Sequence, residues 1–342
     1  MMRIVVTGGA GFIGSNFIRH ILSTYPDYHV MNLDKLTYAG NLENLTDIEQ
    51  SDRYSFLKGD ICDSAVLDGV EFDAIVHFAA ESHVDRSILD ASPFLQTNIM
   101  GTYNLLEITR KKGCSFVHVS TDEVYGSTDD GYFSEQSPLM PNSPYAASKA
   151  SSDMLVRSYV ETHGIHAAIT RCSNNYGPYQ FPEKLIPLVM LNALERKPIP
   201  VYGDGMNVRD WIFVEDHCSA VDAVLHKGKA GDVYNIGVRN ERPNIEIIRI
   251  ILSTLAEKTS SDREELFSLI SYVKDREGHD RRYAIDPSKI EKDLGWRPEI
   301  DFEDGIARTI QWYLESRHWW ERIISGDYLK YYDVQYGSRV KQ

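Results

Sequence analysis

The chain has 342 residues, of which 42% are hydrophobic and 25% are charged. This is the balance of an ordinary globular protein, and it excludes disordered, collagen-like and coiled-coil chains. Acidic residues outnumber basic residues by 50 to 36, and the net charge of -14 argues against nucleic acid or an anionic membrane as a partner. Four cysteines without a CxxC pair, no secretory signal pattern and no long apolar run predict a cytoplasmic protein without a disulfide framework, metal site or membrane span.

Short β-branched runs alternate with amphipathic segments along the first half of the chain. Buried strands are predicted at residues 3–7, 29–33, 54–58, 74–78, 115–120 and 166–171. Helices are expected between them, because apolar residues recur there at helical spacing. This alternation predicts an α/β fold of the Rossmann type, a doubly wound parallel sheet that binds ligands at the carboxyl ends of its strands.

The pattern changes after Arg171, where the chain becomes rich in proline, glycine and tyrosine. This change predicts a smaller C-terminal domain that binds substrate. Residues 232–237 again have the pattern of a buried strand, so the chain is expected to return to the first sheet. We therefore expect a Rossmann domain over residues 1–175 with a return around 211–240, interleaved with a second domain over 176–342.

A glycine-rich turn follows the first strand and opens the first helix. Gly8, Gly11 and Gly14 have the GxxGxxG spacing that lets backbone N–H groups approach a pyrophosphate. Asp34 ends the second strand about twenty residues later, where a carboxylate binds the adenosine ribose and repels a 2'-phosphate, which favours NAD over NADP. The ends of the next strands are expected to line the adenine and ribose pockets with Asp60, Ile61, Phe78, Ala79 and Ala80.

A second motif predicts acid–base chemistry at the start of a helix. Ser143 suits the helix N-cap, which places Tyr145 and Lys149 on one helix face, one turn apart. The ammonium group and a nicotinamide cation would favour the phenolate, which can then take a proton from a substrate hydroxyl as hydride leaves. The same spacing recurs in Tyr54 and Lys58, but on a predicted strand these side chains lie roughly 13 Å apart and cannot cooperate.

Two adjacent acids, Asp122 and Glu123, follow the strand at residues 115–120. Simple alcohol oxidation requires no such pair, so the two carboxyls suggest two further proton transfers. One acid can remove the proton beside a transient ketone, and the other can protonate a leaving hydroxyl. The alternative is a solvated acidic turn, which is the common fate of such a pair.

Taken together, the chain resembles the extended short-chain dehydrogenase/reductases and, within them, the dTDP-glucose 4,6-dehydratase family. The matching segments include TGGAGFIGSNF, LDKLTYAGN, HFAAESHVDRS, STDEVYG, SPYAASKAS, RCSNNYGPYQFPEKLIP, VYGDGMNVRDWIFVEDHC and GHDRRYAID. The resemblance covers nearly the whole chain and implies bound NAD in the first domain and a sugar nucleotide in the second. It also implies dehydration of dTDP-glucose to dTDP-4-keto-6-deoxyglucose, as in the supply of rhamnose for polysaccharide.

The resemblance assigns a role to each site residue. It implies that Thr121 binds the C4 hydroxyl, Asp122 protonates the leaving C6 hydroxyl, and Glu123 removes the C5 proton, with Tyr145 as the base and Lys149 as its tuner. The implied cofactor-binding residues are Gly8, Gly11, Phe12, Ile13, Gly14, Asp34, Lys35, Thr37, Asp60, Ile61, Phe78, Ala79, Ala80, Thr97, Tyr145, Lys149 and Asn175. The implied substrate-binding residues are Ser82, Thr121, Asn174, Lys184, Leu185, Pro200, Tyr202, Arg209, Asn244 and His279, with Arg209 at the diphosphate.

The resemblance also implies a homodimer formed through helices at residues 93–111 and 144–163. Glu277 departs from the family pattern, which carries proline at this position. A less rigid loop is expected there, and activity is expected to survive.

Three other functions are compatible with parts of this pattern. A UDP-hexose 4-epimerase shares NAD, tyrosine and lysine but has no use for Asp122 and Glu123. A GDP-mannose 4,6-dehydratase usually lacks the aspartate before the glutamate. An NAD-binding regulator without catalysis commonly loses the tyrosine or the lysine, and Tyr145 and Lys149 are both present. Nothing in the residues themselves chooses thymidine over uridine.

Overall fold

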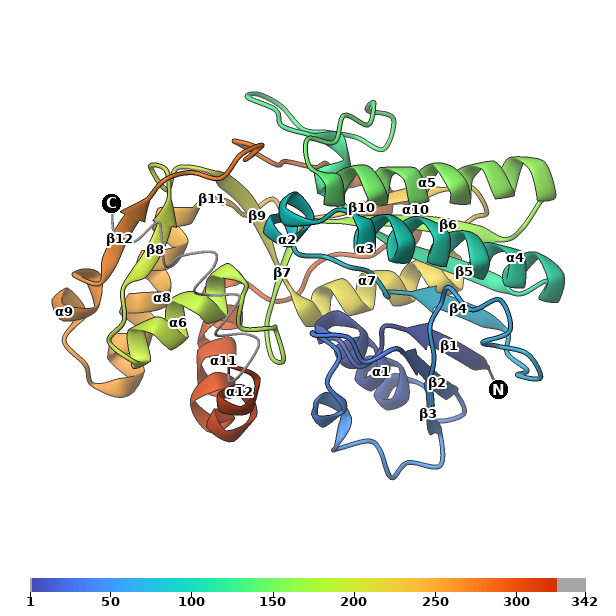
Figure 1. Ribbon diagram of the computed structural model, residues 1–342, viewed down its shortest axis with the longest axis horizontal. Coiled ribbons are helices and arrows are strands. Elements are labelled where there is room, and N and C mark those ends of the chain that lie inside the picture. The colour runs from blue at the N-terminus through green and yellow to red at the C-terminus, as the bar shows by residue number, and fades with distance from the viewer. Residues whose placement is uncertain (1, 325–342) are drawn as a thin grey trace.

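A parallel sheet of seven strands forms the centre of the computed structural model, which describes residues 2–324 (Figure 1). Every neighbouring pair in this sheet is parallel. Buried strands with apolar side chains on both faces are typical of a sheet covered by helices on both sides. In spatial order the strands are β10 (Val233–Ile236), β6 (Ala167–Cys172), β5 (Ser115–Thr121), β4 (Ala74–His77), β1 (Arg3–Thr7), β2 (His29–Asp34) and β3 (Tyr54–Lys58).

Helices pack on both faces of this sheet (Figure 1). On one face, α1, α7 and α10 share a hydrophobic cluster with the strands, and on the other face α4 and α5 form a second cluster. The strand and helix order therefore confirms the predicted doubly wound Rossmann fold. These helices are α1 (Phe12–Thr24), α4 (Thr102–Lys112), α5 (Pro144–His163), α7 (Val214–Lys227) and α10 (Ser288–Leu294).

The helix expected at residues 93–111 consists of three consecutive segments. The short helix α3 (Ser92–Phe94) leads into a π-helix, η2 (Leu95–Gly101), which continues into α4. The hydroxyls of Thr102 and Ser152 both donate to the carbonyl of Asn98 at 2.6 Å. These side-chain bonds compete with backbone N–H groups for a carbonyl inside the helix. A π-helix is a local widening of the helix, and such segments are common near functional sites.

Much of the chain after β6 builds a smaller body with its own core, at the left of Figure 1. It contains a three-stranded sheet, β11-β9-β7, and a parallel pair, β12-β8. Between β9 and β11 the chain passes through α7 to β10, which pairs with β6 in the first sheet. The smaller body comprises β7 (Asn174–Tyr176), α6 (Leu185–Leu194), β8 (Ile199–Tyr202), β9 (Val208–Phe213), β11 (Glu241–Pro243), α8 (Asn244–Thr259), α9 (Arg263–Phe267), β12 (Ile270–Val273), α11 (Phe302–Glu315) and α12 (Arg317–Ile323). Residues 325–342 of the expected second domain lie outside the described residues.

Candidate active site

A cleft of about 350 Å³ lies at the carboxyl ends of the central strands. It is lined by all of the predicted catalytic residues and all of the predicted cofactor-binding residues. Of the predicted substrate-binding residues, it includes Ser82, Thr121, Asn174, Lys184 and Leu185. It does not include Pro200, Tyr202, Arg209, Asn244 and His279. The cleft therefore joins the two predicted chemical motifs, while half of the expected substrate residues lie beyond it.

The glycine-rich turn forms a cradle in which side chains have no room. Gly8 has a φ of +71°, and a Cβ atom there would lie 2.6 Å from the backbone nitrogen of Ala79. A Cβ atom on Gly14 would overlap the carbonyl oxygen of Gly8. Only glycine allows this close packing of turn, helix and strand, which leaves the backbone at the start of α1 facing the cleft.

Asp34 is held at the end of β2 by the backbone. Its carboxylate accepts hydrogen bonds from the backbone N–H groups of Ala10 at 3.0 Å and Leu36 at 2.7 Å. Burial raises the pKa of Asp34, whereas these two hydrogen bonds oppose the rise. Beside it, the Lys35 ammonium pairs with the Asp60 carboxylate at 2.7 Å. The Asp34 carboxylate is thus fixed in the position expected of a group that accepts hydrogen bonds from the ribose.

Several buried polar atoms in the lining have no hydrogen-bond partner among residues 2–324. They include Ser120 Oγ, Asp122 Oδ2, Asn175 Oδ1 and Gln180 Oε1. Buried polar atoms are nearly always paired in folded proteins, so these atoms indicate a polar ligand. The cradle, Asp34 and these atoms together fit the pyrophosphate, ribose and nicotinamide parts of NAD.

Tyr145 and Lys149 lie buried on the first turns of α5, at the inner end of the cleft. The helix begins as predicted, since Ser143 Oγ accepts the N–H of Ala146 at 3.1 Å. Lys149 Nζ donates to the Val119 carbonyl at 2.8 Å, and burial lowers the pKa of Lys149 to about 8.

The protein groups around Tyr145 oppose its ionisation. Burial, followed by the negative charge of Glu123, raises the pKa of Tyr145 well above its ordinary value. These residues therefore keep the phenol protonated, and a further positive charge in the cleft is needed to favour the phenolate. An oxidised nicotinamide ring carries such a charge.

The acid pair lies in a short helical turn directly after β5. Thr121 caps this turn, η3 (Asp122–Tyr125), by accepting the N–H of Glu123 on its Oγ1 at 3.2 Å. Asp122 is only 3% exposed, which excludes the solvated acidic turn considered above. Burial and the neighbouring charge of Glu123 hold the pKa of Asp122 well above its ordinary value.

Nearby positive charges affect the pKa of Glu123 more than the pKa of Asp122. Burial raises the pKa of Glu123, while the charges of Arg276, Arg209 and Lys184 oppose the rise. Tyr283 also faces Glu123, with its hydroxyl 3.5 Å from Oε2, and its ring lies under the Arg209 guanidinium at 4.1 Å. Asp122 therefore keeps its proton more readily than Glu123, which is the order that two-step proton transfer requires.

Arg276 and Tyr283 act on Glu123 but were not among the residues expected from the sequence. Both lie in or beside the loop that carries His279, whose segment GHDRRYAID was part of the resemblance. That segment was the available signal, but its spacing does not show which side chains reach Glu123. The unusual Glu277 in this loop is exposed, and His279 Nδ1 keeps a 2.6 Å contact with Asp275.

The predicted substrate residues outside the cleft lie on the smaller body. Tyr202 ends β8, and its ring centroid lies 6.0 Å from that of His279. Asn244 begins α8, and its buried Oδ1 has no hydrogen-bond partner within the described part of the chain. Pro200 lies within β8, opposite Ser271 of β12.

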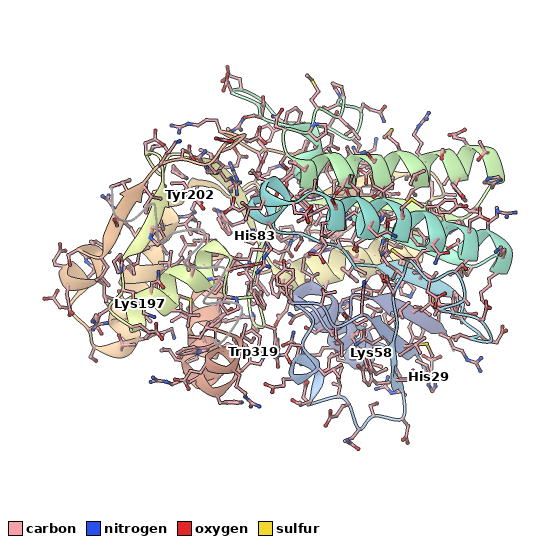
Figure 2. All side chains as sticks on the ribbon, in the orientation of Figure 1. His29, Lys58, His83, Lys197, Tyr202 and Trp319 are labelled. Atoms are coloured by element: carbon pink, nitrogen blue, oxygen red, sulfur yellow. The ribbon has the colours of Figure 1, made fainter. Side chains whose placement is uncertain are left out.

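The second tyrosine–lysine pair has no place in the site. Tyr54 and Lys58 are the first and last residues of β3. Figure 2 shows Lys58 at the β3 edge of the molecule, away from His83 and Tyr202. The strand context therefore separates this pair from the cleft, as expected.

Comparisons with known proteins find relatives over most of the chain. The family model for GDP-mannose 4,6 dehydratase matches residues 5–309. A dTDP-glucose 4,6-dehydratase from Neisseria meningitidis is 53% identical, over 96% of this chain and 98% of its own length. The structure of DesIV (dTDP-glucose 4,6-dehydratase) from Streptomyces venezuelae with NAD and TYD bound has a TM-score of 0.89 at 52% identity, covering 94% of this chain and 100% of that one. A Thermus thermophilus UDP-glucose 4-epimerase complex with NAD has a TM-score of 0.82 at only 29% identity, covering 92% of this chain and 100% of that one.

Proposed function

The chain belongs to the dTDP-glucose 4,6-dehydratase family, and we propose that it removes water from dTDP-glucose to give dTDP-4-keto-6-deoxyglucose. The observation that carries this proposal is the acid pair beside Tyr145 in one cleft, with Asp122 buried and Glu123 partly buried. Epimerisation at C4 requires the tyrosine but leaves this acid pair without a task. Removal of water requires both acids.

The first step is proton removal from the C4 hydroxyl. NAD, held by the glycine cradle and Asp34, would supply a reversible hydride acceptor for C4 and C6. Tyr145 takes the hydroxyl proton, and the Thr121 hydroxyl holds the same oxygen from the end of β5. Lys149, fixed by the Val119 carbonyl, supplies positive charge beside the phenol.

The second step is the elimination of water. A ketone at C4 makes the C5 proton acidic, and Glu123 removes it because nearby cations favour its carboxylate form. Asp122 donates its proton to the C6 hydroxyl as the C6–O bond breaks, and water leaves. A proton at C5 and the hydride that the same cofactor would supply to C6 complete the methyl group, so the reaction would need no external oxidant or reductant.

The two bodies divide the binding of the two ligands in this proposal. Residues 1–175, with the return around 211–240, hold NAD through the glycine cradle and Asp34. Residues 176–342 hold mainly the sugar nucleotide. Three cations around Glu123, namely Lys184, Arg209 and Arg276, suit the anionic diphosphate, and arginine can bind phosphate oxygens with paired donors.

Mass spectrometry tests the reaction directly. After protein, NAD and dTDP-glucose are mixed, the product should be lighter by one water, and an unchanged mass would overturn the proposal. In heavy water the product should carry solvent deuterium at C5, whereas C4 epimerisation leaves that carbon unlabelled. Competition between dTDP-glucose, UDP-glucose and GDP-mannose measures the preference for the nucleotide.

The expected homodimer is supported by an exposed apolar surface. Leu95, Met100, Tyr103 and Met154, on η2, α4 and α5, are each 42–49% exposed. Such a run of large apolar side chains is typical of a protein interface. Light scattering should give the mass of a dimer for the wild type and of a monomer for Met154→Glu, and a monomeric wild type would refute this assembly.

A cytoplasmic location is the remaining part of the proposal. All four cysteines are free thiols, as a reducing compartment maintains them. Across residues 2–324, no helix has both the length and the apolar character that crossing a bilayer requires.

The product is a keto-deoxysugar nucleotide, the kind of precursor from which rhamnose for polysaccharide is made.

A further inference from the structure

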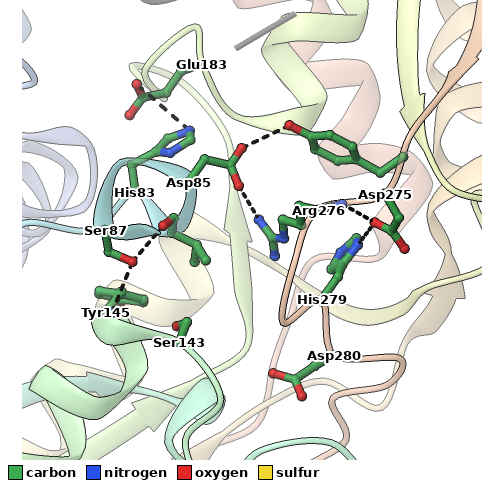
Figure 3. A network of polar contacts seen from close by, with 12 residues as sticks. His83, Asp85, Ser87, Ser143, Tyr145, Glu183, Asp275, Arg276, His279 and Asp280 are labelled. Atoms are coloured by element: carbon green, nitrogen blue, oxygen red, sulfur yellow. Dashed lines mark hydrogen bonds and ion pairs between the residues drawn. The ribbon is translucent and has the colours of Figure 1, made fainter. Parts of the chain in front are cut away.

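Asp85 connects the Rossmann part of the chain to two side chains of the smaller body. It lies in the short helix α2 (Val84–Leu89), and its side chain is 5% exposed. One carboxylate oxygen accepts the Tyr202 hydroxyl at 3.0 Å, and the other pairs with the Arg276 guanidinium at 3.2 Å. Figure 3 shows the contact of Asp85 with the Arg276 guanidinium as a dashed line. Tyr202 comes from β8 and Arg276 from the loop after β12.

The same short helix also touches the catalytic helix. Ser87 Oγ accepts the backbone N–H of Tyr145 at 3.2 Å (Figure 3). That N–H lies in the first turn of α5, where no backbone acceptor is available to it. Val84 packs in one buried cluster with Phe94 and Tyr145. Helix α2 therefore contacts Tyr145 on one side and carries the partner of Arg276 and Tyr202 on the other.

Arg276 retains donors that can bind a ligand. Its Nη1 pairs with Asp85, whereas its buried Nε has no hydrogen-bond partner among residues 2–324. A guanidinium group has five N–H donors, so the contact with Asp85 leaves most of them available. An arginine that is already fixed in one rotamer loses less conformational freedom when an anion binds.

We propose that Asp85 is a positioning residue that holds Tyr202 and Arg276 at a fixed distance from Tyr145. The nucleoside diphosphate is then bound at the distance that places the hexose beside Tyr145. The nature of the ligand, a hexose joined to a nucleoside diphosphate, rests on the function proposed above. Asp85 itself touches neither NAD nor the reacting carbons in this proposal. Its loss should therefore weaken binding of the nucleoside diphosphate while leaving NAD in place.

Two substitutions of Asp85 test this role, and a third variant on the same helix is the control. Asp85→Asn keeps an oxygen that accepts from Tyr202 but loses the charge opposite Arg276, whereas Asp85→Ala loses both contacts. Asp90→Asn removes the same charge at the exposed end of α2 and keeps the oxygen that accepts the N–H of Ser92. Melting temperature and retained NAD verify that each variant is folded and loaded.

We expect Asp85→Ala to raise the KM for dTDP-glucose by about tenfold or more and to change kcat by less than about threefold. Asp85→Asn should raise KM by a smaller factor, and Asp90→Asn should match the wild type. Calorimetric titration with dTDP should show the same order of affinities. A KM within about twofold of the wild type in both Asp85 variants, or a KM below the wild type, would overturn the proposal.

A double-variant cycle shows whether Asp85 acts through Arg276. In an Arg276→Gln background, Asp85→Asn should raise the dTDP dissociation constant by no more than about twofold. An effect as large as in the wild type would contradict a positioning role. The dTDP titration needs no turnover, so it tests the role of Asp85 independently of the reaction. If the wild type binds dTDP but leaves dTDP-glucose unchanged, only the proposed function is refuted. Failure of the wild type to bind dTDP would overturn both.

Discussion

Replacement of Glu123 by glutamine separates the oxidation of C4 from the removal of water. Glutamine keeps the size of the side chain but has no basic carboxylate to receive the C5 proton. Asp122 is a poor substitute, because burial keeps its own proton in place. Loss of a positioned base typically slows a reaction by about 10² to 10⁴-fold, which corresponds to about 3 to 5 kcal/mol in the activation free energy. We expect the upper part of this range, because the neighbouring carboxyl, Asp122, is less favoured in its carboxylate form than Glu123.

The assay combines rapid mixing with isotope labelling. In Glu123→Gln, nicotinamide absorbance should show the reduced cofactor accumulating after dTDP-glucose is added, and the sugar should take up no deuterium at C5 from heavy water. The matched control is Asp122→Asn, in which C5 exchange should continue while loss of water becomes slow. Turnover of Glu123→Gln within about tenfold of the wild type, or continued C5 exchange in that variant, would refute the division of roles.

Two further predictions concern the cofactor cradle and the stability of the Rossmann part. Gly14→Ala should release NAD during gel filtration, because its Cβ overlaps the Gly8 carbonyl, whereas Gly69→Ala, which has open space at Cβ, should retain it. A hydrogen bond to Asp222 raises the pKa of His226. This contact therefore stabilises the fold fully below the unfolded-state pKa of about 6.5. The stabilisation is lost as pH rises through the folded-state pKa of His226. In urea titrations, the stability advantage of the wild type over His226→Gln should therefore fall between about pH 6 and about pH 9, and an advantage that grows with pH would contradict this linkage.

The local parts of the fold were predictable because their physical signals lie close together in the sequence. The apolar run before Gly8 and the spacing of Tyr145 and Lys149 each fall within a few residues. The structure places these segments at strand β1 and at the start of α5, as expected. The π-helix at residues 95–101 was not predictable, because it depends on a bond from Ser152 to a carbonyl more than fifty residues away in the sequence.

The electrostatic parts of the site were less accessible from the sequence. The contact between Asp85 and Arg276 joins residues 191 positions apart, and no local periodicity indicates it. The pKa of Tyr145 also depends on distant segments, because burial and the Glu123 charge raise it. Charges and burial depend on the packing of distant segments, so motif spacing identifies the participating residues better than it identifies their protonation.

The placement of β10 at the edge of the central sheet has a consequence during protein synthesis. The nascent chain completes β6 early, but the strand that covers the free edge of β6 follows only after β7, β8 and β9 have left the ribosome. Until then, unpaired backbone groups along β6 are open to pairing with another chain. A fragment that stops after the first six strands should therefore aggregate more readily than the full chain.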